Sequence, residues 1–325
     1  FIAEAAGRAG GLMMARHLPA ADRLTAADVV LIAPVPGHAA DTELCQAAQR
    51  AGALVIAFGA PPTFPADHPL PGVADPNDPP LPTPQSLRRS RSAVFSYITE
   101  LWVWTGEFVA ACTRRGKMPT MWQSISVPGG IARNEPLQPL KFDERFQVAP
   151  IRAGVLGRAY LKELALRLRR LRERELRRLQ QAARLVRAAR RDGKTVHLWI
   201  RGHLPPLIIG GPQDPAGFRL LPYELPANPG IAAGDVVVFV GYVGADPPLV
   251  DAAANAGAKA IWFAAPDPSL TDARRRGGLV IDQQWRVGDC LVPVPGYDVS
   301  ILPPSAITQL ACYWALVDEA TDSPR

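Results

Sequence analysis

Three glycine-bearing turns of this chain have residue types that could bind a ligand. They lie at residues 35–40, 201–204 and 241–246, each directly after a run of apolar residues. Glycine lets the backbone approach a ligand closely, and a helix that begins just after a strand offers free N–H groups to an anion. We therefore expect these turns to bind an anion such as a sugar phosphate, although a turn between a strand and a helix also favours glycine for structural reasons alone. The candidate ligand-binding residues in these turns are Gly37, His38, Arg201, Gly202, Gly244 and Asp246.

Two stretches with the same layout contain two of these turns. Residues 28–61 and 235–266 each hold an aspartate, an apolar run, the turn, an alanine-rich segment and a second apolar run. The aspartate precedes the turn glycine by nine positions in both (28 to 37, 235 to 244), and the helix-ending glycine precedes the closing proline by nine (52 to 61, 257 to 266). Strands that are apolar throughout are typical of a covered parallel sheet. The sequence therefore predicts an α/β fold of two tandem three-layer α-β-α modules with parallel sheets, at residues 1–150 and 151–325. A length of 325 residues agrees with two domains.

Positive charge is concentrated in one segment. The net charge is +6, but residues 158–194 hold 14 Lys and Arg against 4 Asp and Glu, an excess of 10 that leaves −4 for the remainder. Leucine and alanine recur there at steps of three and four, which predicts a long helix from about Ala153 to Arg191 with one buried face. Its arginines could contact nucleic acid, but no DNA- or RNA-binding motif accompanies them. We expect a solvated basic face, no nucleic-acid partner, and helix pairing within a homodimer.

Several classes of protein are disfavoured by the composition. No apolar run approaches the roughly 18 to 20 residues that cross a bilayer, and no secretory signal pattern is present, so we expect no membrane partner and a cytoplasmic location. The four cysteines are widely scattered without the spacing of metal ligands, so we expect free thiols, no metal and no cofactor. The chain begins at Phe1 rather than Met, and we expect further residues upstream.

Landmarks spread along the chain carry a family resemblance. They are Arg8-Ala9-Gly10-Gly11-Leu12, Gly202-His203 after a strand, Gly288-Asp289-Cys290, and Pro304-Ser305 before a final helix. In combination with the two β-α-β stretches, the chain resembles the SIS (sugar isomerase) family, and is closest to an uncharacterised bacterial branch of it. The resemblance implies two SIS-like modules, the first without its opening strand, and binding of a phosphosugar as the small-molecule partner.

The resemblance also implies catalytic candidates. Residues 1–14 predict a helix ending at Gly10-Gly11, and this helix resembles the one that carries the base of phosphoheptose isomerase. Glu4 would be the base of an aldose–ketose isomerisation, Arg8 would lie near the substrate, and His203 would be a second catalytic group. The alternatives are an i,i+4 ion pair between Glu4 and Arg8, and a structural hydrogen-bonding role for His203.

The chain departs from the family pattern where phosphate would bind. SIS phosphate loops resemble Ser-x-Ser-Gly-x-Thr, whereas residues 34–38 read Pro-Val-Pro-Gly-His and residues 241–245 read Gly-Tyr-Val-Gly-Ala. The serines are absent, and proline removes N–H donors. In the last helix, Gln309 and Cys312 stand at the spacing where phosphoheptose isomerase has a histidine. Two functions stay open: an isomerase that uses Glu4, and a non-catalytic protein that binds a sugar phosphate or a nucleotide sugar.

Overall fold

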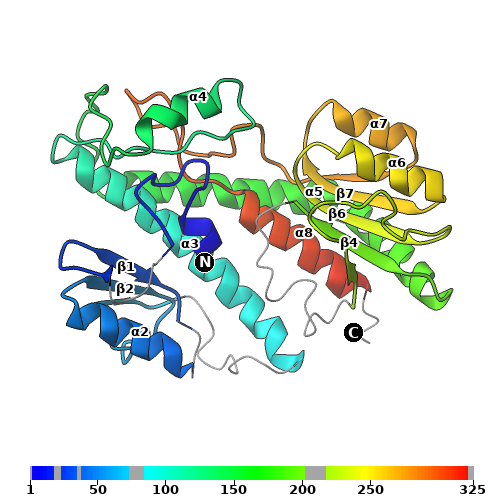
Figure 1. Cartoon of the computed structure of the whole chain (residues 1–325), viewed down its shortest axis with the longest axis horizontal. Coiled ribbons are helices and arrows are strands. Elements are labelled where there is room, and N and C mark those ends of the chain that lie inside the picture. Colours follow the sequence, from blue (N-terminus) through cyan, green and yellow to red (C-terminus); the bar gives the residue numbers. More distant parts are fainter. Residues whose placement is uncertain (1, 18–22, 35–37, 73–83, 202–216, 321–325) are drawn as a thin grey trace. The chain divides into compact units, whose positions relative to one another are not determined.

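The computed structural model describes residues 2–17, 23–34, 38–72, 84–201 and 217–320 (Figure 1). The chain forms two compact units, and each is assembled from separate segments. Unit 1 comprises Phe1–Trp122, Ala132–Leu161 and Val292–Leu302, and unit 2 comprises Gln123–Ile131, Lys162–Leu291 and Pro303–Arg325. Each unit has its own parallel sheet, so the predicted α/β class is confirmed.

Unit 1 contains a three-stranded parallel sheet in the order β1-β2-β3. Its strands are β1 (Val29–Ile32), β2 (Leu54–Phe58) and β3 (His68–Leu70), and its principal helices are α2 (Ala39–Arg50) and α3 (Pro84–Thr113). Cys45 and Ala48 of α2 pack on one face of the sheet, and Leu101 and Trp104 of α3 pack on the other face. The apolar composition of β1 and β2 follows from this two-sided cover.

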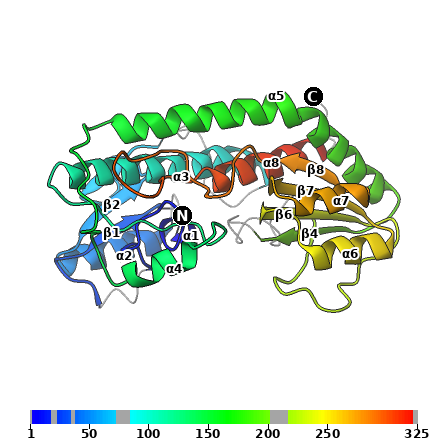
Figure 2. The ribbon, with the colours of Figure 1, turned by 90° about the horizontal axis from the view of Figure 1, so that it is seen from above.

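Unit 2 contains a five-stranded parallel sheet in the order β5-β4-β6-β7-β8. The strands are β4 (Val196–Ile200), β5 (Arg219–Leu220), β6 (Val236–Val243), β7 (Lys259–Ala265) and β8 (Leu279–Asp282). Helices α6 (Pro247–Ala256) and α7 (Ser269–Arg275) cover one face, and α8 (Ser305–Ala320) with the later turns of α5 (Val155–Arg191) covers the other (Figure 2). Trp199, Phe239 and Trp262 form the core beneath α6 and α7. Strand order 2-1-3-4-5 is that of a doubly wound fold, whose order reverses between β4 and β6.

The two β-α-β stretches have the same local structure. The backbone N–H of Leu54 donates to the Asp28 carbonyl at 3.1 Å, and that of Lys259 donates to the Asp235 carbonyl at 2.8 Å. Both helices are followed within two residues by a glycine with positive φ, 81° at Gly52 and 71° at Gly257. These equivalences agree with the observed spacing, while an origin by tandem duplication stays a prediction.

The helix predictions have different outcomes. The long basic helix is confirmed as α5, whose buried stripe includes Leu164, Leu171 and Leu179. The helix predicted over residues 1–14 is wrong, because α1 covers only Ile2–Ala5. Gly7 has φ of +74° and ends the helical path, and the following residues run beside Thr120 and Trp122. Two further short helical segments among the described residues are α4 (Gly130–Asn134) and a 3-10 turn at Glu135–Leu137.

Candidate functional site

Three adjacent strands of unit 2 end with polar or aromatic side chains at the same edge of the sheet. Arg201 follows β4, Tyr223 comes shortly after β5, and Asp246 follows β6. Parallel strands have their carboxyl ends at one edge, and the strand order reverses between β4 and β6. Ligands of open α/β sheets bind at such a switch point. We define Arg201, Tyr223 and Asp246 as the switch-point cluster.

Arg201 is the centre of the switch-point cluster. Its backbone N–H donates to the Val240 carbonyl at 2.9 Å, which extends the pairing of β4 with β6 by one residue. Its guanidinium carbon lies 4.2 Å from the ring centroid of Tyr223 and 4.8 Å from that of Trp199. A guanidinium stacked on aromatic faces is fixed in orientation while its N–H groups stay directed outward. The Arg201 side chain retains 33% exposure, so those groups can reach a ligand.

Asp246 lies beside Arg201 and begins α6. Its Oδ2 is 3.9 Å from Nη2 of Arg201, a long ion pair between partly exposed groups. Its Oδ1 accepts the backbone N–H of Leu249 at 3.2 Å, the usual N-cap hydrogen bond. The carboxylate therefore both starts the helix and balances the charge of Arg201.

The backbone amides of the Gly244 turn are hydrogen-bonded to other groups of the protein. The backbone N–H of Gly244 donates to the Ala265 carbonyl at 3.1 Å, and that of Ala245 donates to the Ser269 hydroxyl at 2.9 Å. A side chain on Gly244 would also collide with Ser269 and Asp267. An anion at this turn would have to displace these hydrogen bonds. The structure thus brings Arg201 and Asp246 together, and places Gly244 beside them with its amide already bonded.

A buried polar network lies farther along the same edge of the sheet. The Asp289 carboxylate accepts the hydroxyl of Tyr242 at 2.9 Å, the hydroxyl of Ser305 at 2.7 Å and the Ser305 backbone N–H at 3.2 Å. The side-chain amides of Gln283 and Gln309 each donate to the Gly241 carbonyl at 3.0 Å. Asp289 therefore supplies a negative charge at the N-terminus of α8, which the helix dipole favours.

Strained backbone occurs in this network and directly beside it. Gln284 and Asp289 are non-glycine residues with φ of 64° and 48°. Such conformations persist only where the surrounding structure compels them. At Asp289 the compelling contacts are the three hydrogen bonds to its carboxylate. Because those bonds are made inside the protein, we interpret the network as support for the sheet edge and not as a ligand site.

Glu4 and Arg8 lie together in unit 1, away from solvent. Glu4 is 2% exposed and Arg8 is 1% exposed, and Nε of Arg8 is 3.5 Å from Oε2 of Glu4. Burial raises the pKa of Glu4, and the charge of Arg8 and the indole of Trp102 offset that rise only in part. A carboxylate with a raised pKa suits a general base, but this one is closed off from solvent in the described conformation.

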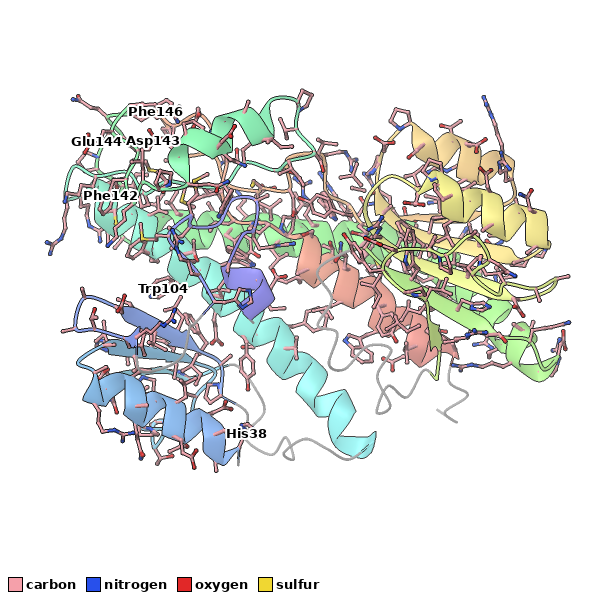
Figure 3. The ribbon with its side chains drawn as sticks, viewed as in Figure 1. His38, Trp104, Phe142, Asp143, Glu144 and Phe146 are labelled. Atoms are coloured by element: carbon pink, nitrogen blue, oxygen red, sulfur yellow. The ribbon has the colours of Figure 1, made fainter. Side chains whose placement is uncertain are left out.

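The remaining predicted residues are dispersed or lie outside the described residues. His38 begins α2 with a side chain that is 59% exposed, and its Nδ1 is 3.4 Å from the Asp41 carboxylate. Figure 3 shows His38 far from the segment of unit 1 that carries Phe142 and Phe146. Gly37, Gly202 and His203 lie outside the described residues.

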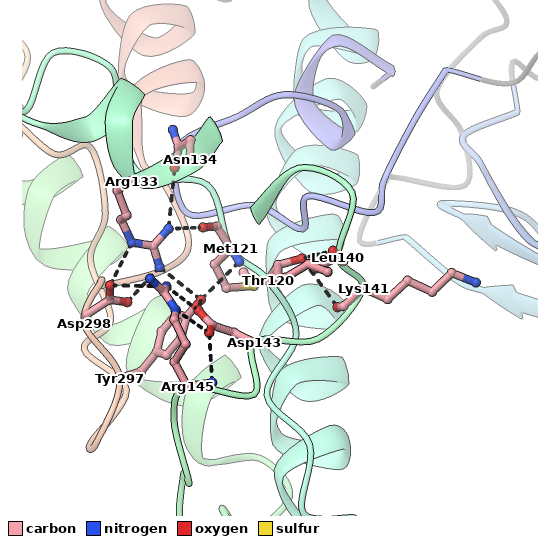
Figure 4. Close-up of polar contacts among 10 residues, drawn as sticks. All are labelled: Thr120, Met121, Arg133, Asn134, Leu140, Lys141, Asp143, Arg145, Tyr297 and Asp298. Atoms are coloured by element: carbon pink, nitrogen blue, oxygen red, sulfur yellow. Dashed lines mark hydrogen bonds and ion pairs between the residues drawn. The ribbon is translucent and has the colours of Figure 1, made fainter. Parts of the chain in front are cut away.

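A second polar cluster occurs in unit 1 (Figure 4). Arg133 forms a bidentate ion pair with Asp298, in which Nη2 and Nε donate to the two carboxylate oxygens at 2.7 and 2.8 Å. It also donates to the Tyr297 hydroxyl at 3.1 Å. Arg145 pairs in the same way with Asp143, and its hydrogen bonds lower the pKa of that carboxyl. Burial raises the pKa of Tyr297 to about 12. The cluster joins residues 133–145 to residues 297–298, and its paired charges indicate a structural role.

His197 also has a structural partner. Its Nε2 lies 3.0 Å from Oδ2 of Asp235, and the ring is fully buried at the amino end of the sheet in unit 2. The Asp235 carboxylate also accepts the backbone N–H groups of Thr195 and Ala232. The pair therefore joins the segments that precede β4 and β6, at the edge opposite to the switch-point cluster.

Tyr223 is the residue of the cluster that the sequence did not indicate. Its side chain is largely exposed, at 67%. Its position depends on β5, a strand of two residues that no periodicity reveals. The only local signal is an aromatic residue after the Leu-Leu-Pro of residues 220–222.

Comparisons with known proteins add no family assignment. No protein-family model matches the chain, and no curated protein matches it. Within the described part of the chain, no group of three or more His, Cys, Asp and Glu side chains is arranged to hold a metal ion. The helices of that part are too short or too polar to cross a membrane. The assignment of the candidate site therefore rests on its geometry alone.

Proposed function

We propose that this chain is a SIS-like protein that binds a sugar derivative at the switch-point cluster without converting it. The ligand class comprises sugars, sugar phosphates and nucleotide sugars. The observation that carries the proposal is the convergence of Arg201, Tyr223 and Asp246 from the carboxyl ends of three adjacent parallel strands. A guanidinium, a carboxylate and an exposed aromatic ring together provide hydrogen bonds to hydroxyl groups and a flat surface for a sugar ring.

The contacts of the carboxylates in and near the cluster favour a non-catalytic role. Proton transfer between the carbons of a sugar needs a base within hydrogen-bond reach of the ligand. Asp246 can accept hydrogen bonds from a ligand, but taking up a proton would weaken its contacts with the helix cap and with Arg201. The nearby Asp289 carboxylate is already bonded by Tyr242 and Ser305. The carboxylates among the described residues of this edge are therefore better suited to binding a ligand than to abstracting a proton from it.

Binding is tested by calorimetric titration of the full chain with sugars, sugar phosphates and nucleotide sugars. A ligand should bind the wild type, and the Arg201→Ala variant should bind it at least about tenfold more weakly, as expected for the loss of a hydrogen bond from a charged group. Arg286→Ala is the matched control, since Arg286 is a 65% exposed arginine whose ion pair is 3.5 Å long. Binding to no member of the panel, or equal weakening by the two substitutions, would refute the proposal.

A second candidate function is a sugar-phosphate isomerase with Glu4 as base. The observation that favours it is the raised pKa of this buried carboxyl beside Arg8. For this function the segment around α1 would have to open, because Glu4 is closed off from solvent. Turnover of any aldose or ketose phosphate by the wild type, abolished in Glu4→Gln, would establish it. A wild-type protein that binds a ligand but interconverts no sugar phosphate would eliminate it.

A further inference from the structure

Four of the backbone amides around Asp246 are already hydrogen-bonded within the protein. Helix α6 begins with Pro247 and Pro248, which have no N–H. The next two amides, of Leu249 and Val250, donate to the side chain and to the backbone carbonyl of Asp246, at 3.2 and 3.0 Å. The preceding amides, of Gly244 and Ala245, are bonded to Ala265 and Ser269. A helix start that binds phosphate needs several of these N–H groups to be unbonded.

The charge at the helix start also opposes a phosphate. The Asp246 carboxylate occupies the position where the helix dipole would favour an anionic ligand. Its Oδ2 lies 3.9 Å from Arg201, so the positive charge of Arg201 is balanced by the protein itself. A phosphate dianion at this place would be repelled by Asp246 and would have to compete with it for Arg201.

From these contacts we infer that the ligand of the switch-point cluster is a neutral sugar, whose hydroxyl groups contact Asp246 and Arg201 and whose ring packs on Tyr223. Asp246 accepts hydrogen bonds from hydroxyl groups, and Arg201 donates to hydroxyl oxygens. The exposed Tyr223 ring offers apolar area to the C–H face of a sugar. This inference rests on the proposed function and specifies its ligand class.

The test compares each sugar with its own phosphate ester. Calorimetric titrations of the full chain use glucose, fructose and N-acetylglucosamine, each beside its 6-phosphate. At least one neutral sugar should bind more tightly than its ester. Esters that bind alone, or more tightly than every parent sugar, would overturn the inference and leave the proposed function standing. Binding of none of these compounds, and of no nucleotide sugar in the titrations of the proposed function, would overturn both.

The substitution Asp246→Asn separates the role of the charge from that of the fold. Asparagine caps a helix about as well as aspartate, so α6 should be preserved. The variant should bind the neutral sugar at least about tenfold more weakly and should shift the preference toward the ester. Asp251→Asn is the matched control, because Asp251 lies in the same helix with 56% exposure. Unchanged sugar binding in Asp246→Asn would overturn the inference.

Tyr223 provides an independent check on ring packing. Tyr223→Phe keeps the ring and should retain neutral-sugar binding, whereas Tyr223→Ala should weaken it about fivefold. Equal affinity of Tyr223→Ala and wild type would contradict contact of the sugar with this ring. Circular dichroism of both variants verifies that the exposed substitution leaves the fold intact.

Discussion

The Glu107 carboxylate accepts the backbone N–H of Gly157 at 3.1 Å, and thereby attaches α3 to the first turn of α5 within unit 1. The same carboxylate accepts the N–H of Gly154 at 2.6 Å. A side chain from another helix thus satisfies two of the N–H groups that a helix start leaves unpaired, with a negative charge at the positive end of a 37-residue helix. The close approach also depends on Gly157 itself, where a Cβ would lie 3.1 Å from Val103.

Removing this charge should destabilise the protein. Glu107→Gln keeps the size of the side chain but has a single acceptor oxygen, so one amide of the α5 start loses its partner. We expect a loss of about 1 kcal/mol in the free energy of unfolding, the usual effect of an N-cap. Urea denaturation measures it. Glu173→Gln on the exposed face of α5 is the control and should stay within about 0.5 kcal/mol of wild type; equal stability of the two variants would contradict the cap.

Gly59 should not tolerate alanine. It has φ of +62°, and a Cβ there would overlap the Tyr97 ring. Gly116 also has positive φ, +68°, but nothing lies within 4 Å of its would-be Cβ. Gly116→Ala should therefore cost about 1 kcal/mol from backbone strain, and Gly59→Ala at least about 2 kcal/mol because overpacking is added. Thermal unfolding of the two variants measures these losses in stability. Equal losses would show that the Tyr97 ring moves aside without cost.

The Asp235–His197 pair should make the protein sensitive to acid. Burial alone would raise the pKa of Asp235, but hydrogen bonds from Ala232, His197 and Thr195 together lower it below its ordinary value. A carboxyl whose pKa is lower in the folded state stabilises the fold above its unfolded pKa, about 3.9, and this contribution is lost as pH falls through the folded pKa. Asp235→Asn should be less stable than wild type at pH 6, with a smaller difference at pH 3. Urea midpoints at both pH values measure this, and a difference that grew on acidification would refute it.

The elements were largely predictable from local pattern, and the site was predictable only in part. The Asp and Gly spacing of residues 28–61 and 235–266 predicted the β-α-β units, and the Leu and Ala periodicity predicted α5. Both patterns reflect contacts between residues close in sequence. Arg201 and Asp246 were indicated because both directly follow apolar strands. Tyr223 and Glu107 were not, because their roles depend on residues that lie 22 and 50 positions away, Arg201 and Gly157. The helix predicted over residues 1–14 was wrong because Gly7 ends the helical path with its positive φ, and the residues after it hydrogen-bond to Thr120 and Trp122 instead.

The effect of Glu4 on the free energy of unfolding should depend on pH in the direction opposite to that of Asp235. Because burial raises its pKa, the folded state holds this proton more tightly than the unfolded chain. Its contribution is therefore fully present below the unfolded pKa, about 4.3, and is lost as pH rises through the folded pKa. Glu4→Gln removes the titrating group and keeps its shape, so the variant should lose less stability than wild type between pH 4 and pH 7. Glu144→Gln, at an exposed position of unit 1, is the control and should follow the wild-type profile. If Glu4→Gln and wild type lose the same stability across this range, the Arg8 ion pair outweighs burial, and the carboxylate is charged throughout.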